Sequence, residues 1–262
     1  MIRVGLIGNG GIAQDLLDHM ARRPDKFVLT GILDAPDVID PPHKDHLVPD
    51  LPALIAGQPD VIVECATVEA LAEDAEAVLT AGIDLIAVSI GGLAMGDVLA
   101  RARAAAERSG ARLHLVAGAL AGVDGLAAAH YRGLRQVTYR SRKPPTAWAG
   151  APGTEGHDLS DLREPLVLFQ GTARESAVKY PKNANATATA ALAGLGLDET
   201  AVELVADPGV TRNMHIITAE GDFGRFTIEM AGEPSAHNPR TSALTAASII
   251  RALENRETAI VI

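Results

Sequence analysis

Short apolar runs alternate with longer amphipathic stretches through the first 118 residues of the chain. The runs have the length of strands, and the stretches between them place apolar residues at helical spacing. The expected strands are residues 2–7, 27–33, 61–63, 83–88 and 113–116, and the expected helices are one carrying Leu16, Leu17 and Met20, then residues 69–81 and 93–108. This alternation predicts β-α-β units and a doubly wound parallel sheet, which is the Rossmann class of α/β fold.

The pattern changes after residue 118. Residues 137–142, 166–170, 202–205, 215–219 and 225–230 are short runs in which apolar and polar positions tend to alternate. Half-buried strands of this kind favour an antiparallel or mixed sheet with helices on one face. The sequence therefore predicts a Rossmann domain over residues 1–118, followed by an α+β domain in the middle of the chain.

Composition narrows the class of partner. The chain has 262 residues, 47% of them apolar, and a formal net charge of −10. Binding to nucleic acid or to an anionic membrane depends on clustered Lys and Arg, so we expect neither partner. The single cysteine, Cys65, excludes an intramolecular disulfide, and no stretch reaches the length of a membrane span. Because no secretory signal pattern is present, the protein is expected to be cytoplasmic.

The first strand runs directly into a glycine-rich turn, GNGGIA at residues 8–13, and then into a helical pattern. Strand, turn and helix in this order are the structural context of a dinucleotide-binding fingerprint. Gly8 allows the sharp turn, Gly10 lets the backbone approach a pyrophosphate, and the small Ala13 lets the helix pack on the strand. The phosphates then lie at the helix N-terminus. The expected cofactor contacts in this turn are Gly8, Gly10, Gly11 and Ile12.

Asp34 ends the second expected strand, at the distance along the chain where the fingerprint places an acidic residue. A carboxylate there accepts hydrogen bonds from the ribose hydroxyls and repels a 2′-phosphate. The sequence therefore predicts a dinucleotide cofactor that Asp34 also contacts, with NAD favoured over NADP.

Several polar residues have both a functional and a structural interpretation. His43 and His46 could bind a metal, but their Pro- and Asp-rich surroundings favour a solvated loop, so no metal site is expected. Cys65 follows the strand at residues 61–63, where ligands bind in such sheets, yet a small buried apolar role is favoured over a nucleophile. Glu64 is either a structural carboxylate or a residue on the cofactor side.

Two segments of small residues have open interpretations. Residues 118–125, GALAGVDG, form either a loop into the next helix or a crossover beneath the nicotinamide. Residues 180–194 contain Asn183, which is expected to cap a helix whose first turns hold only Ala, Thr and Asn. Such a helix favours close packing against a flat partner, either a sheet or the cofactor. Lys182 adds a cation where the helix N-terminus already favours an anion.

Residues 211–226 are typical of a hairpin that turns near Gly221. Strand alternation places His215 on one face with Asn213 and Ile217. A histidine on a strand is most often structural, but the other seven histidines lie in helices, in loops or near the ends of elements. His215 is therefore the candidate for acid–base chemistry, because the unperturbed pKa of histidine is close to neutral pH.

Several motifs are spread along the chain. They are GNGGIA at residues 8–13, GALAGVDGL at 118–126, YPKNANATATA at 180–190, NMHIITAEGDFG at 213–224 and NPRTSALTAASIIRAL at 238–253. Together they resemble the L-aspartate dehydrogenase family, and the middle three are much more specific than the glycine turn. The resemblance implies that residues 238–262 pack back on the Rossmann domain. It also implies an α+β catalytic and dimerisation domain of residues 119–237, in a homodimer.

The resemblance implies reversible, NAD(P)-dependent oxidative deamination of L-aspartate through iminoaspartate to oxaloacetate and ammonia, an activity linked to NAD biosynthesis. It places the active-site histidine at His215 and cofactor contacts at Ala119 and Asn185. Hydride transfer needs the substrate Cα–H against the nicotinamide, and imine hydrolysis needs a group that takes a proton from water. The two substrate carboxylates need cations and hydrogen-bond donors. The expected catalytic residues are His215 and Lys182, and the expected substrate contacts are Lys182, Asn183, Arg240 and Thr241.

The chain departs from the family pattern over residues 143–165 and at residues 89–94, SIGGLA, which are richer in glycine than is usual. Both departures bear on substrate scope. One alternative is another Rossmann oxidoreductase, of the homoserine dehydrogenase or dihydrodipicolinate reductase type. A Lys-x-x-x-Gly-Thr motif in the second domain would favour the reductase, and the sequence has none. The other alternative is a dinucleotide-binding protein without turnover.

Overall fold

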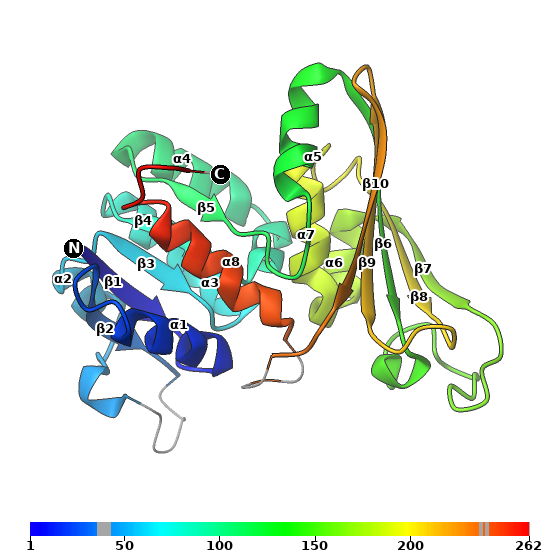
Figure 1. Cartoon of the computed structure of the whole chain (residues 1–262), viewed down its shortest axis with the longest axis horizontal. Helices are drawn as coiled ribbons and strands as arrows, with labels where there is room; N and C mark the ends of the chain where they lie inside the picture. Colours follow the sequence, from blue (N-terminus) through cyan, green and yellow to red (C-terminus); the bar gives the residue numbers. More distant parts are fainter. Residues whose placement is uncertain (36–42, 236–237, 239–240, 262) are drawn as a thin grey trace. The chain divides into compact units, whose positions relative to one another are not determined.

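The structure is a computed structural model that describes residues 1–35, 43–235, 238 and 241–261. The chain forms two compact units, Met1–Gly118 with Ser235–Ile262, and Ala119–Pro234. Each unit has a sheet of its own (Figure 1). Among the described residues, none of the helices is long and apolar enough to cross a bilayer.

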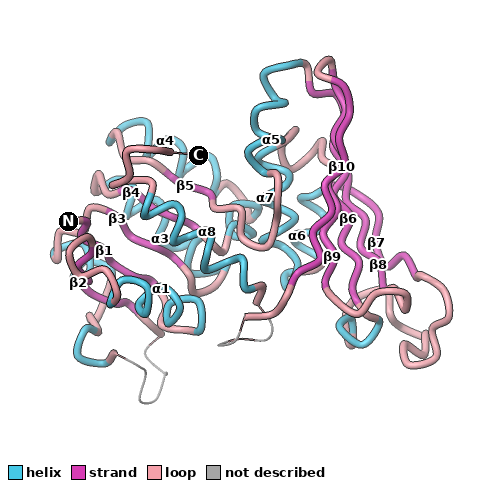
Figure 2. The backbone as a smooth tube through the Cα atoms, in the orientation of Figure 1, coloured by secondary structure: helices cyan, strands magenta, loops and turns pink. Residues whose placement is uncertain are grey.

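The first unit is built on a parallel sheet with the strand order β2-β1-β3-β4-β5. Its strands are Ile2–Ile7 (β1), Phe27–Leu33 (β2), Val61–Glu64 (β3), Asp84–Ala87 (β4) and Leu113–Leu115 (β5). Its helices are Gly11–Ala21 (α1), Leu51–Ala56 (α2), Val68–Thr80 (α3), Val98–Ser109 (α4) and Ala243–Glu254 (α8). Strands and helices alternate as expected (Figure 2), and the order of the strands reverses at β1 and β3. The predicted doubly wound Rossmann fold is therefore confirmed.

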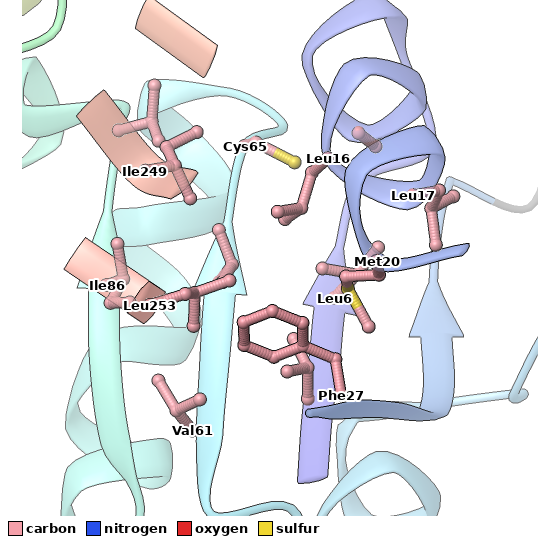
Figure 3. Packing of buried hydrophobic residues seen from close by; sticks show 14 of the residues in the cluster. Leu6, Leu16, Leu17, Met20, Phe27, Val61, Cys65, Ile86, Ile249 and Leu253 are labelled. Atoms are coloured by element: carbon pink, nitrogen blue, oxygen red, sulfur yellow. The ribbon is translucent and has the colours of Figure 1, made fainter. Parts of the chain in front are cut away.

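Helices α1 and α8 cover one face of this sheet (Figure 3). Apolar side chains of the strands and of both helices form one buried cluster, which includes Leu6, Val61, Ile86, Leu16, Leu17, Met20, Ile249 and Leu253. The carboxylate of Glu254 also accepts a hydrogen bond from Lys26 Nζ (2.8 Å) and is hydrogen-bonded to His19 Nε2 (3.0 Å). Both the burial of apolar area and these charged contacts hold α8 on the first unit.

The helix expected over residues 93–108 is divided in two. Ile90–Ala94 forms a 3-10 helix, and α4 begins at Val98. Gly96 between them has a φ of 49°, which glycine adopts without strain. A Cβ on Gly92 would overlap the carbonyl oxygen of Val68, so the close approach of this segment to α3 requires glycine. The apolar pattern predicted helical geometry correctly but did not locate the break.

The second unit has a mixed sheet with the strand order β10-β9-β6-β8-β7. Its strands are Leu134–Lys143 (β6), Leu166–Thr172 (β7), Ala201–Ala206 (β8), Asn213–Gly221 (β9) and Gly224–Gly232 (β10). β6 and β8 are parallel, and the other neighbours are antiparallel. Helices Val123–Ala129 (α5), Ala173–Lys179 (α6) and Ala184–Ala193 (α7) lie on one face of this sheet (Figure 1). The predicted α+β architecture and the hairpin of β9 and β10 are confirmed.

Candidate active site

The glycine turn joins β1 to α1 at the carboxyl edge of the parallel sheet. Gly8 has a φ of 100°, and a Cβ there would lie 2.9 Å from the backbone of Ala66, just beyond β3. Both features require glycine. A Cβ on Gly10 would instead point into open space, and no side chain caps α1, which begins with Gly11 and Ile12. The first N–H groups of α1 and this open space fit a phosphate group.

Asp34 directly follows β2 and is half-buried. β1 and β2 are parallel neighbours with Ile7 opposite Leu33, so Asp34 lies beside Gly8 at the same edge. One carboxylate oxygen of Asp34 accepts a hydrogen bond from the N–H of Ala35 (2.9 Å). Because an acidic group stands next to the phosphate-sized space, this edge of the sheet fits the ribose and pyrophosphate of a dinucleotide.

Glu64 and Cys65 lie at this edge in structural roles. The buried carboxylate of Glu64 accepts hydrogen bonds from the N–H groups of Ala66 (2.8 Å) and Ser89 (2.9 Å). Burial raises the pKa of Glu64, while the hydrogen bonds from Ser89 and Ala66 oppose that rise. The carboxylate therefore holds in place the backbone that Gly8 contacts. Burial also raises the pKa of the Cys65 thiol, which favours an inert apolar side chain over a nucleophile.

The helix of small residues, α7, packs against β6, α5 and α6 within the second unit. Thr187, Ala188 and Ala191 are buried, so one of the two interpretations, the helix–sheet contact, is observed. Asn185 is exposed in this unit. Asn183 occupies the expected N-cap position of α7, but its side chain makes no hydrogen bond to the helix N-terminus. Its Oδ1 instead accepts a charge-assisted hydrogen bond from Lys143 Nζ, which is stronger than a neutral cap.

The remaining expected contacts are distributed over both units. Lys182 is exposed in the 3-10 helix Pro181–Asn183, and Ala119 is half-buried at the start of the second unit. Thr241 belongs to the first unit, where its N–H donates to the carbonyl oxygen of Asn238 (2.9 Å). Arg240 lies outside the described residues. The described part of the chain contains no group of three or more His, Cys, Asp or Glu side chains that could hold a metal ion.

His215 lies on the face of β9 that the helices cover, and the residue is 8% exposed. The hydroxyl of the fully buried Tyr139, from β6, is 2.7 Å from Nδ1 of His215, and the two rings are nearly parallel. Ser141 stands opposite His215 in the register of β6 and β9. Its buried Oγ lies close to the hydroxyl of Tyr139 and has no other hydrogen-bond partner among the described residues. The histidine is thus part of a buried polar cluster inside an otherwise apolar layer.

Lys143 ends β6 on the same face as Tyr139 and Ser141. Its Nζ is 5.0 Å from the centre of the Trp148 ring, in addition to the hydrogen bond to Asn183. Burial lowers the pKa of Lys143 to about 8. Burial, and to a smaller extent the charge of Lys143, lowers the pKa of His215 to about 4. At neutral pH the imidazole is therefore uncharged and stands near a cation.

Sequence reasoning missed Tyr139 and Lys143. The signal was present in the spacing of Tyr139, Ser141 and Lys143, which are two residues apart on one strand. The expected strand ended at residue 142, however, and a lysine followed by two prolines is typical of a surface loop. Only the register of β6 with β9 brings these side chains close to His215.

Comparison with known proteins covers both units. The family model described as "Homoserine dehydrogenase, NAD binding domain" matches residues 8–116, and the one described as "Aspartate dehydrogenase, C-terminal" matches residues 124–256. With the glycine turn and the Rossmann fold, these matches define an oxidoreductase whose cofactor is NAD or NADP. L-aspartate dehydrogenases of Ralstonia pickettii and Cupriavidus necator are 43% and 41% identical to the chain, over 99% of each protein. The chain belongs to the aspartate dehydrogenase family, as its motifs predict.

Solved structures show the same fold. The aspartate dehydrogenase of Thermotoga maritima has a TM-score of 0.80 at 24% identity, covering 100% of this chain and 99% of that one. An amine dehydrogenase of Mycobacterium smegmatis has a TM-score of 0.54 at 13% identity, covering 97% of this chain and 91% of that one. At these identities the likeness concerns the fold alone.

Proposed function

We propose that the protein catalyses the reversible, NAD-dependent oxidative deamination of L-aspartate to oxaloacetate and ammonia through iminoaspartate. The observation that carries this proposal is the identity of 43% with an L-aspartate dehydrogenase over 99% of both proteins. The two sites support it, because the first unit fits a dinucleotide and the second holds buried groups suited to proton exchange.

The cofactor site is assigned to residues that the structure describes. Gly8, Gly10 and the first turn of α1, Gly11 and Ile12, would hold the pyrophosphate, and Asp34 would hold the ribose. When bound, the dinucleotide accepts the hydride from the substrate Cα. Further contacts from Ala119 and Asn185 are part of the proposal. The carboxylate of Asp34 supports NAD as the preferred form, since it would repel a 2′-phosphate.

The substrate site is assigned to the inner face of the second sheet. His215 would contact the substrate beside its reacting carbon. A dicarboxylate needs local positive charge in a chain whose net charge is −10, and Lys182 of the same unit is proposed to supply it. Asn183, Arg240 and Thr241 are kept as proposed substrate contacts. A homodimer formed by residues 119–237, a cytoplasmic location and a role in NAD biosynthesis complete the proposal.

The test is NADH formation from L-aspartate at alkaline pH. The panel of controls is D-aspartate, L-glutamate, L-asparagine and L-homoserine, and we expect L-aspartate to give the highest kcat/KM. Oxidation of NADH by oxaloacetate should depend on added ammonia, which tests reversibility and separates the reaction from simple reduction of the ketone. Turnover of L-homoserine instead would support the homoserine dehydrogenase alternative. Cofactor binding without any turnover would support the non-catalytic one.

A further inference from the structure

Two titratable side chains stand near each other on the inner face of the second sheet, His215 from β9 and Lys143 from β6. Ser141 lies opposite His215 in the register, and Lys143 is two residues further along the same face of β6. Diagonal positions of this kind are about 7–8 Å apart, which long side chains can bridge. The question is which of the two groups exchanges a proton with water during the reaction.

The hydrogen bond to Tyr139 decides the tautomer of His215. The buried hydroxyl of Tyr139 is hydrogen-bonded to Nδ1 of His215 and interacts with the hydroxyl of Ser141, which has no other partner among the described residues. If Tyr139 accepted a hydrogen from Nδ1, one of the two hydroxyl hydrogens would be buried without an acceptor, which is unfavourable. Tyr139 therefore donates to Nδ1, and the neutral imidazole carries its hydrogen on Nε2. In this form the free side of the ring is a hydrogen-bond donor and has no lone pair to accept a proton.

Lys143 has the complementary properties. No carboxylate of the described residues forms an ion pair with its ammonium, which lies between Asn183 and the ring of Trp148. The charged groups on the elements around it are satisfied elsewhere or exposed: Arg142 pairs with Asp207 (2.7 Å), and Lys182 is exposed. Burial lowers the pKa of Lys143 to about 8, so a large fraction of the side chain is a neutral amine in mildly alkaline solution.

We propose that Lys143 takes up and returns the proton during hydrolysis of the imine, while Tyr139 holds His215 as an Nε2–H donor to the substrate. This inference rests on the proposed function. Water adds to the iminium carbon, and the neutral amine of Lys143 takes one of its protons, which leaves a carbinolamine. The ammonium of Lys143 then gives that proton to the nitrogen. The C–N bond breaks, ammonia leaves, and the remaining hydroxyl proton passes to Lys143 as the carbonyl forms.

The first test compares the pH dependence of kcat for the wild type, Lys143→Met and Lys143→Arg with L-aspartate. In the wild type, kcat should rise with pH through the pKa of Lys143, because the neutral amine is the active form. Both variants should lose about 100-fold or more in kcat and should lack this rise, since neither side chain exchanges a proton in that range. In Lys143→Ala, added ethylamine should restore part of the turnover.

Lys179→Met is the matched control. Lys179 is exposed in the same unit, and its Nζ also stands over an aromatic ring, 5.9 Å from the centre of Phe169. This variant should keep the wild-type rate and pH profile. A near-normal rate in Lys143→Arg would show that Lys143 acts through its charge alone and would overturn the proposal. A raised KM for L-aspartate with unchanged kcat in Lys143→Met would do the same, because it would make Lys143 a carboxylate-binding residue.

The second test locates the proton on His215 by nitrogen NMR of the histidine-labelled protein. The hydrogen should be on Nε2 in the wild type, and Tyr139→Phe should give a mixture of tautomers and a lower kcat with little change in KM. A wild-type hydrogen on Nδ1 would contradict the assigned role of Tyr139.

The NMR result and the fold of each variant do not depend on the substrate. If the wild type does not oxidise L-aspartate at all, the proposed function fails, whereas normal wild-type turnover with an unchanged profile in Lys143→Met defeats this inference alone.

Discussion

The two units place their functional groups by different means. In the first unit the groups are mostly backbone atoms of one short segment, the turn around Gly8 and Gly10, with the side chain of Asp34 beside it. In the second unit they are side chains from separate elements, Tyr139 and Lys143 on β6 and His215 on β9. The geometry of a site made of backbone atoms depends on whether a Cβ fits at each position. The geometry of a site made of side chains depends on their burial and hydrogen bonding.

This difference determines how each site should fail. A substitution at Gly8 in the glycine turn should act through sterics and should damage the fold together with cofactor binding. A substitution in the buried cluster should remove chemistry while leaving most of the fold intact.

Gly8→Ala should have the largest effect. The Cβ would meet the backbone of Ala66 at 2.9 Å, and alanine is strained at a φ of 100°. Strain and overpacking together should cost about 4 kcal/mol of the free energy of unfolding, measured by urea titration. Gly10→Ala is the control, because its φ is −81° and its Cβ points into open space. It should keep the fold and raise the NAD dissociation constant, and equal stability of the two variants would remove the steric argument.

His215→Ala should have the next largest effect. Loss of the imidazole removes the group proposed to contact the substrate, so kcat should fall by about 100-fold, or about 2.7 kcal/mol of activation free energy. The NAD dissociation constant, measured by fluorescence titration, should change little. His215→Asn keeps a hydrogen-bond donor and should be less damaged if donation is the role of His215. Near-normal turnover in both variants would place the chemistry elsewhere.

The same difference explains which features the sequence predicted. The turn at residues 8–13 is contiguous, so its residue types alone predicted the strand, turn and helix that the structure shows. The strands β6 and β9 were also expected, from alternating positions. Their register was not predictable, because nothing local determines that Ser141 stands opposite His215. Lys143 was also overlooked because the expected strand ended one residue before it, at residue 142.

Predictions from local sequence failed where a tertiary contact was stronger than the expected local interaction. Asn183 has the residue type of a helix cap, but a buried lysine competes successfully for its side-chain oxygen. The helix expected over residues 93–108 is divided near Gly96, whose φ is 49°, and Gly92 lies close to Val68 in α3; the apolar periodicity contains neither feature. In both places the sequence predicted the type of structure, and packing determined its details.

Acid stability should distinguish the buried cluster from the glycine turn. Burial holds the pKa of His215 at about 4, below its ordinary value of 6.5, so the unfolded chain binds a proton there before the folded one does. Stability should therefore fall as pH drops below 6.5, by about 2.6 kcal/mol at pH 4.5, and the loss should be complete below pH 4. Urea titrations should show that His215→Asn lacks this component. Identical pH dependence in the two proteins would contradict the burial of a neutral imidazole.

Asp34→Ala should have the smallest effect and tests the one side chain assigned to the cofactor site of the first unit. The carboxylate is half-buried beside Gly8, where it would accept hydrogen bonds from the ribose hydroxyls and repel a 2′-phosphate. The wild type should therefore have a higher kcat/KM with NAD than with NADP. The variant should have a lower kcat/KM with NAD and a higher one with NADP, so the ratio of the two narrows by about tenfold, or about 1.4 kcal/mol.

Asp45→Ala is the control, because it removes the same charge from the exposed 3-10 helix Lys44–His46 and should leave the ratio unchanged. If both variants change the NAD-to-NADP ratio of kcat/KM equally, the preference for NAD arises from net charge and not from the position of Asp34. If the wild type uses NADP as efficiently as NAD, Asp34 does not select the cofactor.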